Sequence, residues 1–327
     1  MKNPLVILSG PTAAGKTKLS LALAKKIGGE IISADSMQVY RYMDIGTAKI
    51  KFEETEGVRH HLIDCLNPDE EFNVSVFCEL AEKAASEIYQ RNHIPIVVGG
   101  TGFYIQAFLK GVSFDEEDHS DGFREQLALT AERPDGAALL YRELQEKDPD
   151  SALAIPQGNV KRVIRALEFL HYHGYPISKH NQAEQEKPAR YRFAYFVLEK
   201  NRDELYDGIN QRVDRMMEEG LLKEVEELRK KGYDRASVAM QGLGYKQLLP
   251  YFDGLCTIEE ATERIKQETR HFAKRQLTWF RREKDCIHFN KSILSEEEIL
   301  QQMLRILEEK DICHGVFNGS VPEIRNT

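Results

Sequence analysis

The chain has 327 residues, of which 41% are apolar and 30% charged, so it can bury one large core or two smaller ones. No apolar run approaches the roughly 18 residues of a membrane-spanning helix, and the first is too short for a signal peptide, so we expect a cytoplasmic protein without membrane contact. The net charge of −8 excludes a protein that coats nucleic acid with its whole surface, and five scattered cysteines exclude a zinc site or a disulfide framework.

Strand and helix patterns alternate through the first hundred residues. In chain order they predict a strand at 5–8, a helix at 16–27, a strand at 30–33, a possible strand at 61–64, a helix at 74–91 and a strand at 95–98. This alternation favours a parallel sheet with helices on both faces. In such folds ligands bind at the carboxyl ends of the strands.

The pattern changes from about residue 113. An acid-rich stretch and then helical periodicity follow, before a strand pattern returns at 191–198 and rejoins the sheet. Further helical patterns cover 202–231, 258–284 and 294–310. We therefore predict a discontinuous core domain of residues 1–115 and 188–312, a mostly helical insertion domain of residues 116–187, and a loose tail of residues 313–327.

Residues 10–17 (GPTAAGKT) match the phosphate-binding pattern GxxxxGK[ST] in full, between a predicted strand and a predicted helix. This context indicates an α/β fold of the P-loop NTPase type. The glycines let backbone N–H groups turn toward a phosphate, and the helix start adds partial positive charge. Lys16 would reach terminal phosphate oxygens, and Thr17 would offer its hydroxyl to Mg²⁺. The predicted diphosphate-binding residues of this loop are Gly10, Pro11, Thr12, Ala13, Ala14, Gly15, Lys16 and Thr17.

The features that would complete a nucleoside triphosphate site are weak or missing in the sequence. There is no NKxD motif for guanine, and the strand at 95–98 ends in glycine and threonine rather than in an acid for Mg²⁺. ATP binding is thus indicated by the loop motif alone. A P-loop small-molecule kinase and a non-catalytic P-loop RNA-binding protein are the alternatives that these residues leave open.

Further motifs follow the loop in chain order. They are residues 35–40 (DSMQVY), 46–49 (GTAK), 99–104 (GGTGFY), 159–168 (NVKRVIRALE), 212–214 (RVD) with 220–221 (GL), 241–246 (QGLGYK) and 275–281 (RQLTWFR). Together with the loop they resemble the bacterial tRNA dimethylallyltransferase family, also called tRNA isopentenyltransferases. Ala14 departs from the serine that is common in the family's loop, but its backbone amide is retained.

The resemblance implies transfer of a dimethylallyl group from dimethylallyl diphosphate to N6 of adenosine 37, next to the tRNA anticodon, with release of pyrophosphate. The loop would then hold an isoprenoid diphosphate together with Mg²⁺, which explains the missing triphosphate features. The implied partners are the tRNA anticodon stem-loop and dimethylallyl diphosphate, and we expect a monomer.

The same resemblance implies roles for residues outside the loop. Asp35 would be the general base that takes the N6 proton, and Thr101 would hydrogen-bond the bridging diphosphate oxygen or the adenosine. Arg212 would be a further phosphate ligand. Each has a structural alternative: an Asx turn or helix cap for Asp35, an incidental turn residue for Thr101 and a solvated side chain for Arg212.

Basic residues concentrate between Arg264 and Lys284, where eight Lys or Arg accompany two Glu. Ile265, Phe272 and Trp279 recur every seven residues, which predicts one buried stripe with basic residues on the exposed faces. Such a helix fits along RNA phosphates, although a solvated basic helix is the alternative. The predicted tRNA-binding residues are Asp35, Ser36, Met37, Gln38 and Thr101 beside the base, Lys274, Arg275, Arg281 and Arg282 on the basic helix, and Arg124, Arg162 and Arg165 in the insertion.

Overall fold

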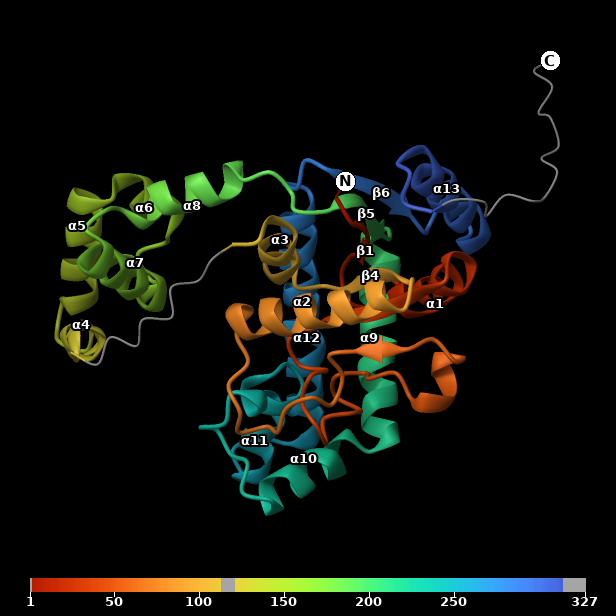
Figure 1. Ribbon diagram of the computed structural model, residues 1–327. Helices are drawn as coiled ribbons and strands as arrows, with labels where there is room; N and C mark the ends of the chain where they lie inside the picture. Colours follow the sequence, from red (N-terminus) through yellow and green to blue (C-terminus); the bar gives the residue numbers. More distant parts are fainter. Residues whose placement is uncertain (1, 113–120, 314–327) are drawn as a thin grey trace. The chain divides into compact units, whose positions relative to one another are not determined.

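The computed structural model describes residues 2–112 and 121–313 (Figure 1). The chain divides into two compact units, one built from residues 1–109 and 190–327 and the other from residues 110–189. The acid-rich stretch at 113–120 and the predicted tail from residue 314 onward lie outside the described residues. Cys313, where the predicted tail begins, is buried at 5% exposure in the core of the first unit.

A six-stranded parallel sheet forms the centre of the first unit, in the order β3-β2-β4-β1-β5-β6. The strands are β1 (Pro4–Ser9), β2 (Gly29–Ala34), β3 (His60–His61), β4 (Ile94–Gly99), β5 (Arg192–Glu199) and β6 (Cys286–Asn290). Val6 of β1 pairs with Ile96 of β4 on one side and with Ala194 of β5 on the other. The central strands are apolar because both of their faces are covered.

Helices flank this sheet. Helices α1 (Lys16–Ile27) and α13 (Glu296–Glu309) share a hydrophobic core with the side of β1 that carries Val6 and Leu8. Since side chains alternate along a strand, Leu5 and Ile7 point to the opposite face. Helix α2 (Val74–Gln90) packs against β2 and β4, and its Phe77 ring stacks on Tyr104 of α3 (Gly102–Lys110).

Four further helices lie beyond the carboxyl ends of the strands in the first unit. They are α9 (Arg202–Glu219), α10 (Leu221–Lys230), α11 (Tyr245–Phe252) and α12 (Ile258–Phe280). The short 3₁₀ turn η2 (Ala239–Gln241) lies between α10 and α11, and another, η1 (Phe52–Thr55), lies between β2 and β3. The 23-residue α12 packs along both α9 and α11. Its start is fixed by a capping box, in which Thr257 and Glu260 each bind the other's backbone N–H.

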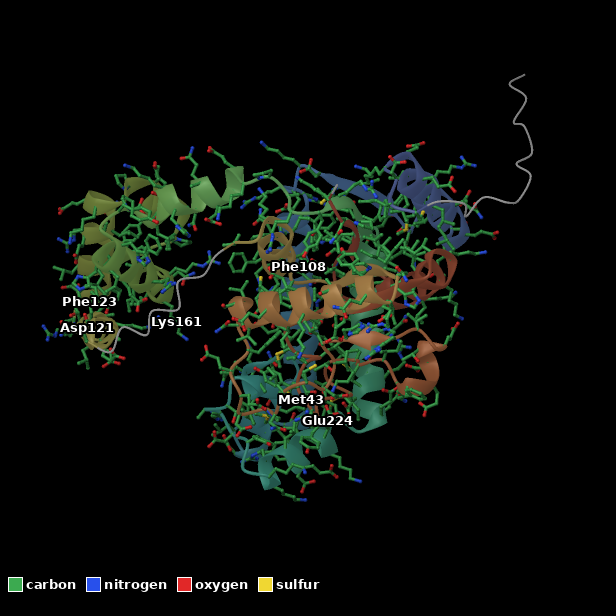
Figure 2. All side chains as sticks on the ribbon, in the orientation of Figure 1. Met43, Phe108, Asp121, Phe123, Lys161 and Glu224 are labelled. Atoms are coloured by element: carbon green, nitrogen blue, oxygen red, sulfur yellow. The ribbon has the colours of Figure 1, made fainter. Side chains whose placement is uncertain are left out.

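The second unit is helical and has a core of its own. It contains α4 (Phe123–Ala131), α5 (Gly136–Lys147), α6 (Pro149–Ala154), α7 (Val160–His173) and α8 (Ile177–Glu186). Leu140 and Leu144 of α5 pack against Val163 and Leu167 of α7. The ring of Phe123, labelled in Figure 2, stacks on His171 with the centroids 3.8 Å apart.

Two predicted elements differ from the observed ones, and one edge strand was not predicted. The possible strand at 61–64 stops at His61, because Leu62 (φ 61°) and Asp64 (φ 54°) adopt left-handed conformations that cannot continue a ladder. The single helix predicted at 202–231 is two helices, separated by Gly220 at φ 105°. The edge strand β6 was not predicted, because it is only five residues long and comes shortly after a long helix.

Candidate active site

A cavity of about 710 Å³ opens in the first unit where β1, β2, β4 and β5 end. Its walls come from the loops after these strands and from α9 and α12. The loop after β1 contributes Thr12, Ala13, Gly15, Lys16 and Thr17, whereas Gly10, Pro11 and Ala14 do not line the cavity. The site therefore occupies the sheet edge at which parallel α/β proteins bind ligands.

The loop after β1 owes its path to two glycines. Gly10 has φ 138°, and a Cβ there would collide with the carbonyl oxygen of Leu198 on β5. Gly15 has φ 83° and forms the N-cap of α1, whose first turn contains no acidic residue. The free N–H groups of that turn and the helix dipole make the loop an anion-binding site.

Lys16 is held against the backbone of the loop. Its Nζ donates to the carbonyl oxygens of Gly10 (2.9 Å) and Pro11 (2.8 Å). Burial, together with the positive charge of Arg212, lowers the pKa of Lys16 to about 7, and the negative charge of Asp35 opposes this shift only in part. The ammonium group is thus poorly solvated, and a bound anion would stabilise its charged form.

Additional cationic side chains line the same cavity. Arg212 and Arg215 reach it from α9, and Lys200 follows directly on the end of β5. Arg212 interacts electrostatically with Asp35 and with Arg215. Arg212 was predicted from the sequence, whereas Lys200 and Arg215 were not. Lys200 could have been found as the first cation after a predicted strand, and Arg215 as a neighbour one turn beyond Arg212.

The sheet register brings Asp35 and Thr101 together. Ala34, the last residue of β2, pairs with Gly99, the last residue of β4, and a Cβ on Gly99 would collide with the Ala34 carbonyl. Asp35 and Thr101 follow these paired ends and both line the cavity. Oδ1 of Asp35 accepts hydrogen bonds from the N–H groups of Met37 (2.9 Å) and Gln38 (3.4 Å). This is an Asx turn, and it orients the carboxylate that lines the cavity.

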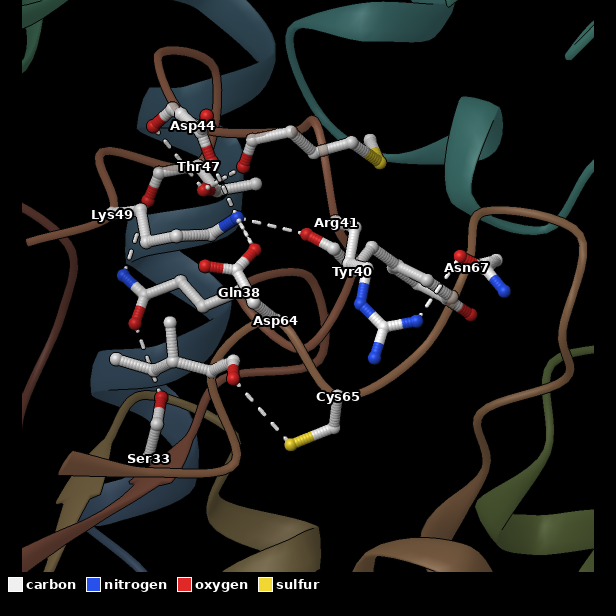
Figure 3. A network of polar contacts seen from close by, with 12 residues as sticks. Ser33, Gln38, Tyr40, Arg41, Asp44, Thr47, Lys49, Asp64, Cys65 and Asn67 are labelled. Carbon is white, nitrogen blue, oxygen red and sulfur yellow. Dashed lines mark hydrogen bonds and ion pairs between the residues drawn. The ribbon is translucent and has the colours of Figure 1, made fainter.

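The segment after Asp35 is tied to the loop at 44–49. Gln38 Nε2 donates to the carbonyls of Thr47 (3.2 Å) and Ala48 (3.4 Å), while its Oε1 accepts from Ser33 Oγ (3.1 Å) (Figure 3). Lys49 Nζ, almost fully buried, bonds Asp44 Oδ1, Asp64 Oδ1 and the Tyr40 carbonyl. Ser36, Met37 and Gln38 all line the cavity, but the amide of Gln38 is engaged by these internal partners.

Glu224 of α10 holds the same loop from the other side. Its carboxylate accepts from the N–H groups of Asp44 (2.9 Å), Ile45 (2.8 Å) and Gly46 (3.1 Å). It also accepts from the hydroxyl of Tyr245 (2.7 Å), a residue of the QGLGYK motif. Figure 2 labels Glu224 beside Met43, which precedes this loop. Two of the sequence motifs are therefore joined through one acid that sequence patterns did not single out.

Helix α12 differs from the stripe predicted for it. Ile265 is buried, but Phe272 lines the cavity and Trp279 is half-buried against the turn at Gly102, where a Cβ would collide with its ring. The buried stripe consists of Ala261, Ile265, Thr269, Ala273, Gln276 and Phe280. Its spacing follows the 3.6-residue helical repeat rather than seven residues, and it includes two polar side chains.

The predicted tRNA-binding cations occupy different places. Arg275 lines the cavity, while Lys274, Arg281 and Arg282 are exposed. In the 110–189 unit, Arg124 and Arg165 form ion pairs with Glu168, with Nη1 of each arginine 3.1 Å and 3.3 Å from Oε2. Arg162 is exposed on α7 of that unit.

A metal ion could be held only with help from the ligand. Within residues 2–112 and 121–313, no group of three His, Cys, Asp or Glu side chains is arranged to bind a metal. The exposed Thr17 lines the cavity at the first turn of α1. One hydroxyl plus diphosphate oxygens and waters is a donor set that suits Mg²⁺, which binds few protein ligands when phosphates are present.

In the same described ranges, no helix has the length and apolar character needed to cross a bilayer.

Comparison with known proteins gives consistent matches along the chain. The family model described as IPP transferase matches residues 38–283, and the one described as Isopentenyl transferase matches residues 3–68. The chain is 54% identical over 310 residues to a tRNA dimethylallyltransferase of Lachnoclostridium phytofermentans, covering 94% of this chain and 99% of the relative. It is 49% identical over 289 residues to the Bacillus subtilis protein of that name, covering 88% and 91%.

Solved structures agree with these sequence matches. A tRNA delta(2)-isopentenylpyrophosphate transferase from Staphylococcus epidermidis matches with a TM-score of 0.70 and 40% identity, covering 94% of this chain and 100% of the other. A eukaryotic dimethylallyltransferase acting on tRNA matches with a TM-score of 0.79 and 29% identity, covering 99% and 82%. The P-loop fold expected from the sequence is confirmed.

Proposed function

The chain belongs to the IPP transferase family, and from that membership we propose that it transfers a dimethylallyl group from dimethylallyl diphosphate to N6 of adenosine 37 beside a tRNA anticodon. Relatives named tRNA dimethylallyltransferase align with nearly the whole chain, so it is an enzyme of this class. For the site, one observation carries the proposal: Asp35 and Thr101 share a cavity with an anion-binding loop and its surrounding cations.

The chemistry assigned to Asp35 is general base catalysis. The N6 amine attacks C1 of the dimethylallyl group, a carbon–nitrogen bond forms, and the C1–O bond breaks with its electron pair leaving on pyrophosphate. Asp35 takes one N6 proton as this happens. Its Oδ1 is held by two backbone N–H groups, which fixes the carboxylate for that task. Thr101, on the adjacent strand end, hydrogen-bonds the bridging oxygen or the adenosine.

The leaving group is stabilised by the cationic end of the cavity. Lys16 exchanges the carbonyls of Gly10 and Pro11 for diphosphate oxygens, and the N–H groups at the start of α1 contribute their partial charges. Arg212 supplies a further positive charge close to Asp35 and Lys16. Mg²⁺, if held by the Thr17 hydroxyl and the diphosphate, would supply additional charge neutralisation there.

The tRNA is bound through phosphates and through the flipped base. Lys274, Arg275, Arg281 and Arg282 provide a basic surface, and Arg124, Arg162 and Arg165 a second one in the 110–189 unit. Adenosine 37 leaves the stack to reach Asp35, where Ser36 and Met37 border it and Gln38 orders the neighbouring 46–48 segment. We further propose that the enzyme acts as a cytoplasmic monomer.

The alternatives explain less of this arrangement. A small-molecule kinase would be expected to hold Mg²⁺ through an acid at the end of β4, yet this strand leads into Gly100 and Thr101, and kinase activity gives no role to the basic surface of α12. A non-catalytic RNA-binding protein gives no reason for a lysine, an arginine and a carboxylate to meet beside a phosphate-binding loop.

The test is transfer of radiolabel from dimethylallyl diphosphate to unmodified tRNA bearing A36-A37-A38, with ATP hydrolysis followed in parallel. The wild type should label the tRNA, and Asp35→Asn should lower kcat by about 10²- to 10⁴-fold, the usual contribution of a general base. Asp207→Asn on α9, an exposed carboxylate outside the cavity, is the matched control and should behave as wild type. Release of phosphate from ATP without labelled tRNA would establish a kinase instead.

A further inference from the structure

One buried amide on α12 joins two loops that carry different parts of the site. Gln276 Oε1 accepts a hydrogen bond from the N–H of Thr12 (3.0 Å), in the phosphate-binding loop. Its Nε2 donates to the carbonyl oxygen of Gly100 (2.9 Å), the residue before Thr101. The side chain is only 6% exposed.

The contact leaves little room for either partner to move. A Cβ on Gly100 would collide with Gln276 Nε2, and a Cβ on Gly102 would collide with the indole ring of Trp279, one turn further along α12. The helix is thus pressed against the turn that carries Thr101. A larger residue at either position would force Gln276 or Trp279 to shift.

Both bonds require a side chain that accepts and donates at once, over the reach of a glutamine. An amide offers an acceptor to an N–H and a donor to a carbonyl, whereas a carboxylate can only accept and an apolar side chain can do neither. The distance between Thr12 and Gly100 therefore depends on residue 276 being glutamine. Thr12 belongs to the loop that would hold the diphosphate. Gly100 leads into Thr101, which lies beside the proposed general base Asp35.

We infer that Gln276 is a positioning residue that sets the distance between the diphosphate and the adenosine, an inference that rests on the proposed function. The attacking nitrogen and C1 must approach within about 3–3.5 Å in line, and displacements of the order of 1 Å can cost 10²-fold in rate. Gln276 lines the cavity, but its amide oxygen and nitrogen are engaged by Thr12 and Gly100, so each substrate binds mainly through other groups. Its loss therefore acts on kcat more than on either affinity.

The experiment compares Gln276→Met and Gln276→Ala with Gln267→Ala, an exposed glutamine on the same helix. Methionine keeps the length and volume of the side chain but makes neither bond. For Gln276→Met we expect kcat to fall at least tenfold, with the KM for tRNA within about twofold and the Kd for pyrophosphate within about fivefold of wild type. If thermal melting shows that Gln276→Met does not fold, Gln276→Ala replaces it in the same measurements.

Hydrogen exchange gives a readout that does not depend on activity. In the folded variant, amides of residues 10–15 and 99–103 should exchange at least tenfold faster than in the wild type, while those in Gln267→Ala are unchanged. A kcat within twofold of wild type, or unchanged exchange in both segments, would overturn the inference. Absence of transfer in the wild type itself, with faster exchange in Gln276→Met, would refute the proposed function and leave only the link that Gln276 makes between the two loops.

Discussion

Lys16 shows how single residues of this site are prepared for an anion. Its ammonium group bonds two backbone carbonyls while the cavity and Arg212 lower its pKa to about 7. Near neutral pH the side chain is consequently only partly protonated. A bound diphosphate adds negative charge beside Nζ and raises that pKa, so binding and protonation are linked.

This linkage predicts proton uptake when pyrophosphate binds. Above pH 7 the free protein has lost part of the Lys16 charge, and the complex regains it, so the affinity should fall as the pH rises from about 7. Calorimetry in two buffers of different ionisation enthalpy measures the number of protons taken up. Uptake should be lost in Lys16→Met, and the same uptake in that variant would assign the proton to another group.

At the scale of elements, α12 combines a buried face that shapes the cavity with an exposed basic face. Gln276 and Thr269 are buried, whereas Lys274 is exposed on the helix and Arg282 just beyond its end. Cations near a helix C-terminus also complement the dipole, so the surface is compatible with a stable helix. This division lets RNA binding be altered without disturbing the chemistry.

The exposed face should account for much of the salt dependence of tRNA binding. In Lys274→Gln/Arg282→Gln, each lost phosphate contact should reduce the slope of log K against log salt by about 0.7–0.9. Filter binding or calorimetry at several salt concentrations measures the slope. The control is Lys223→Gln/Lys230→Gln on α10, which removes two exposed lysines that pair with glutamates. An equal change in both double variants would show that only net charge matters.

Local strands, loops and helices could be predicted from the sequence, whereas the long-range contacts of the site could not. The strand, loop and helix of residues 4–27 were foreseen because glycine spacing and apolar periodicity are local signals. The break at Gly220 was missed since periodicity continues across a left-handed glycine. Glu224 and Gln276 acquire their roles from contacts with segments more than 170 residues away in the chain, which no local pattern records.

At the scale of the whole molecule, an ionised side chain stabilises the amino end of the sheet, which lies opposite the cavity. Glu30, at the start of β2, is nearly buried and accepts hydrogen bonds from Arg91, His61 and His93. Burial alone would raise the pKa of this carboxyl, but these hydrogen bonds outweigh it and lower the pKa to about 2. The first unit is therefore partly stabilised by the ionised form of one side chain.

Acid unfolding should reveal this contribution. A lowered pKa stabilises the folded state fully above about pH 4.5, and the stabilisation disappears as the pH falls toward 2. Glu30→Gln should lower the free energy of unfolding at pH 7 by about 1.5–3 kcal/mol, the usual worth of a hydrogen bond to a charged group. It should also flatten the dependence between pH 4.5 and 2, measured by urea titration. Glu53→Gln, at an exposed position, should leave both unchanged.

The two residues of the first unit that flank the 110–189 unit in the chain, Leu109 and Arg190, are hydrogen-bonded to each other. The N–H of Arg190 donates to the carbonyl oxygen of Leu109, 2.9 Å away, so the chain closes behind the excursion. Closing a loop becomes costlier only with the logarithm of its length, about 0.6 kcal/mol for each doubling. The free energy of folding of the sheet therefore depends only weakly on the length of chain between these two residues, so lengthening or shortening that module costs the core little.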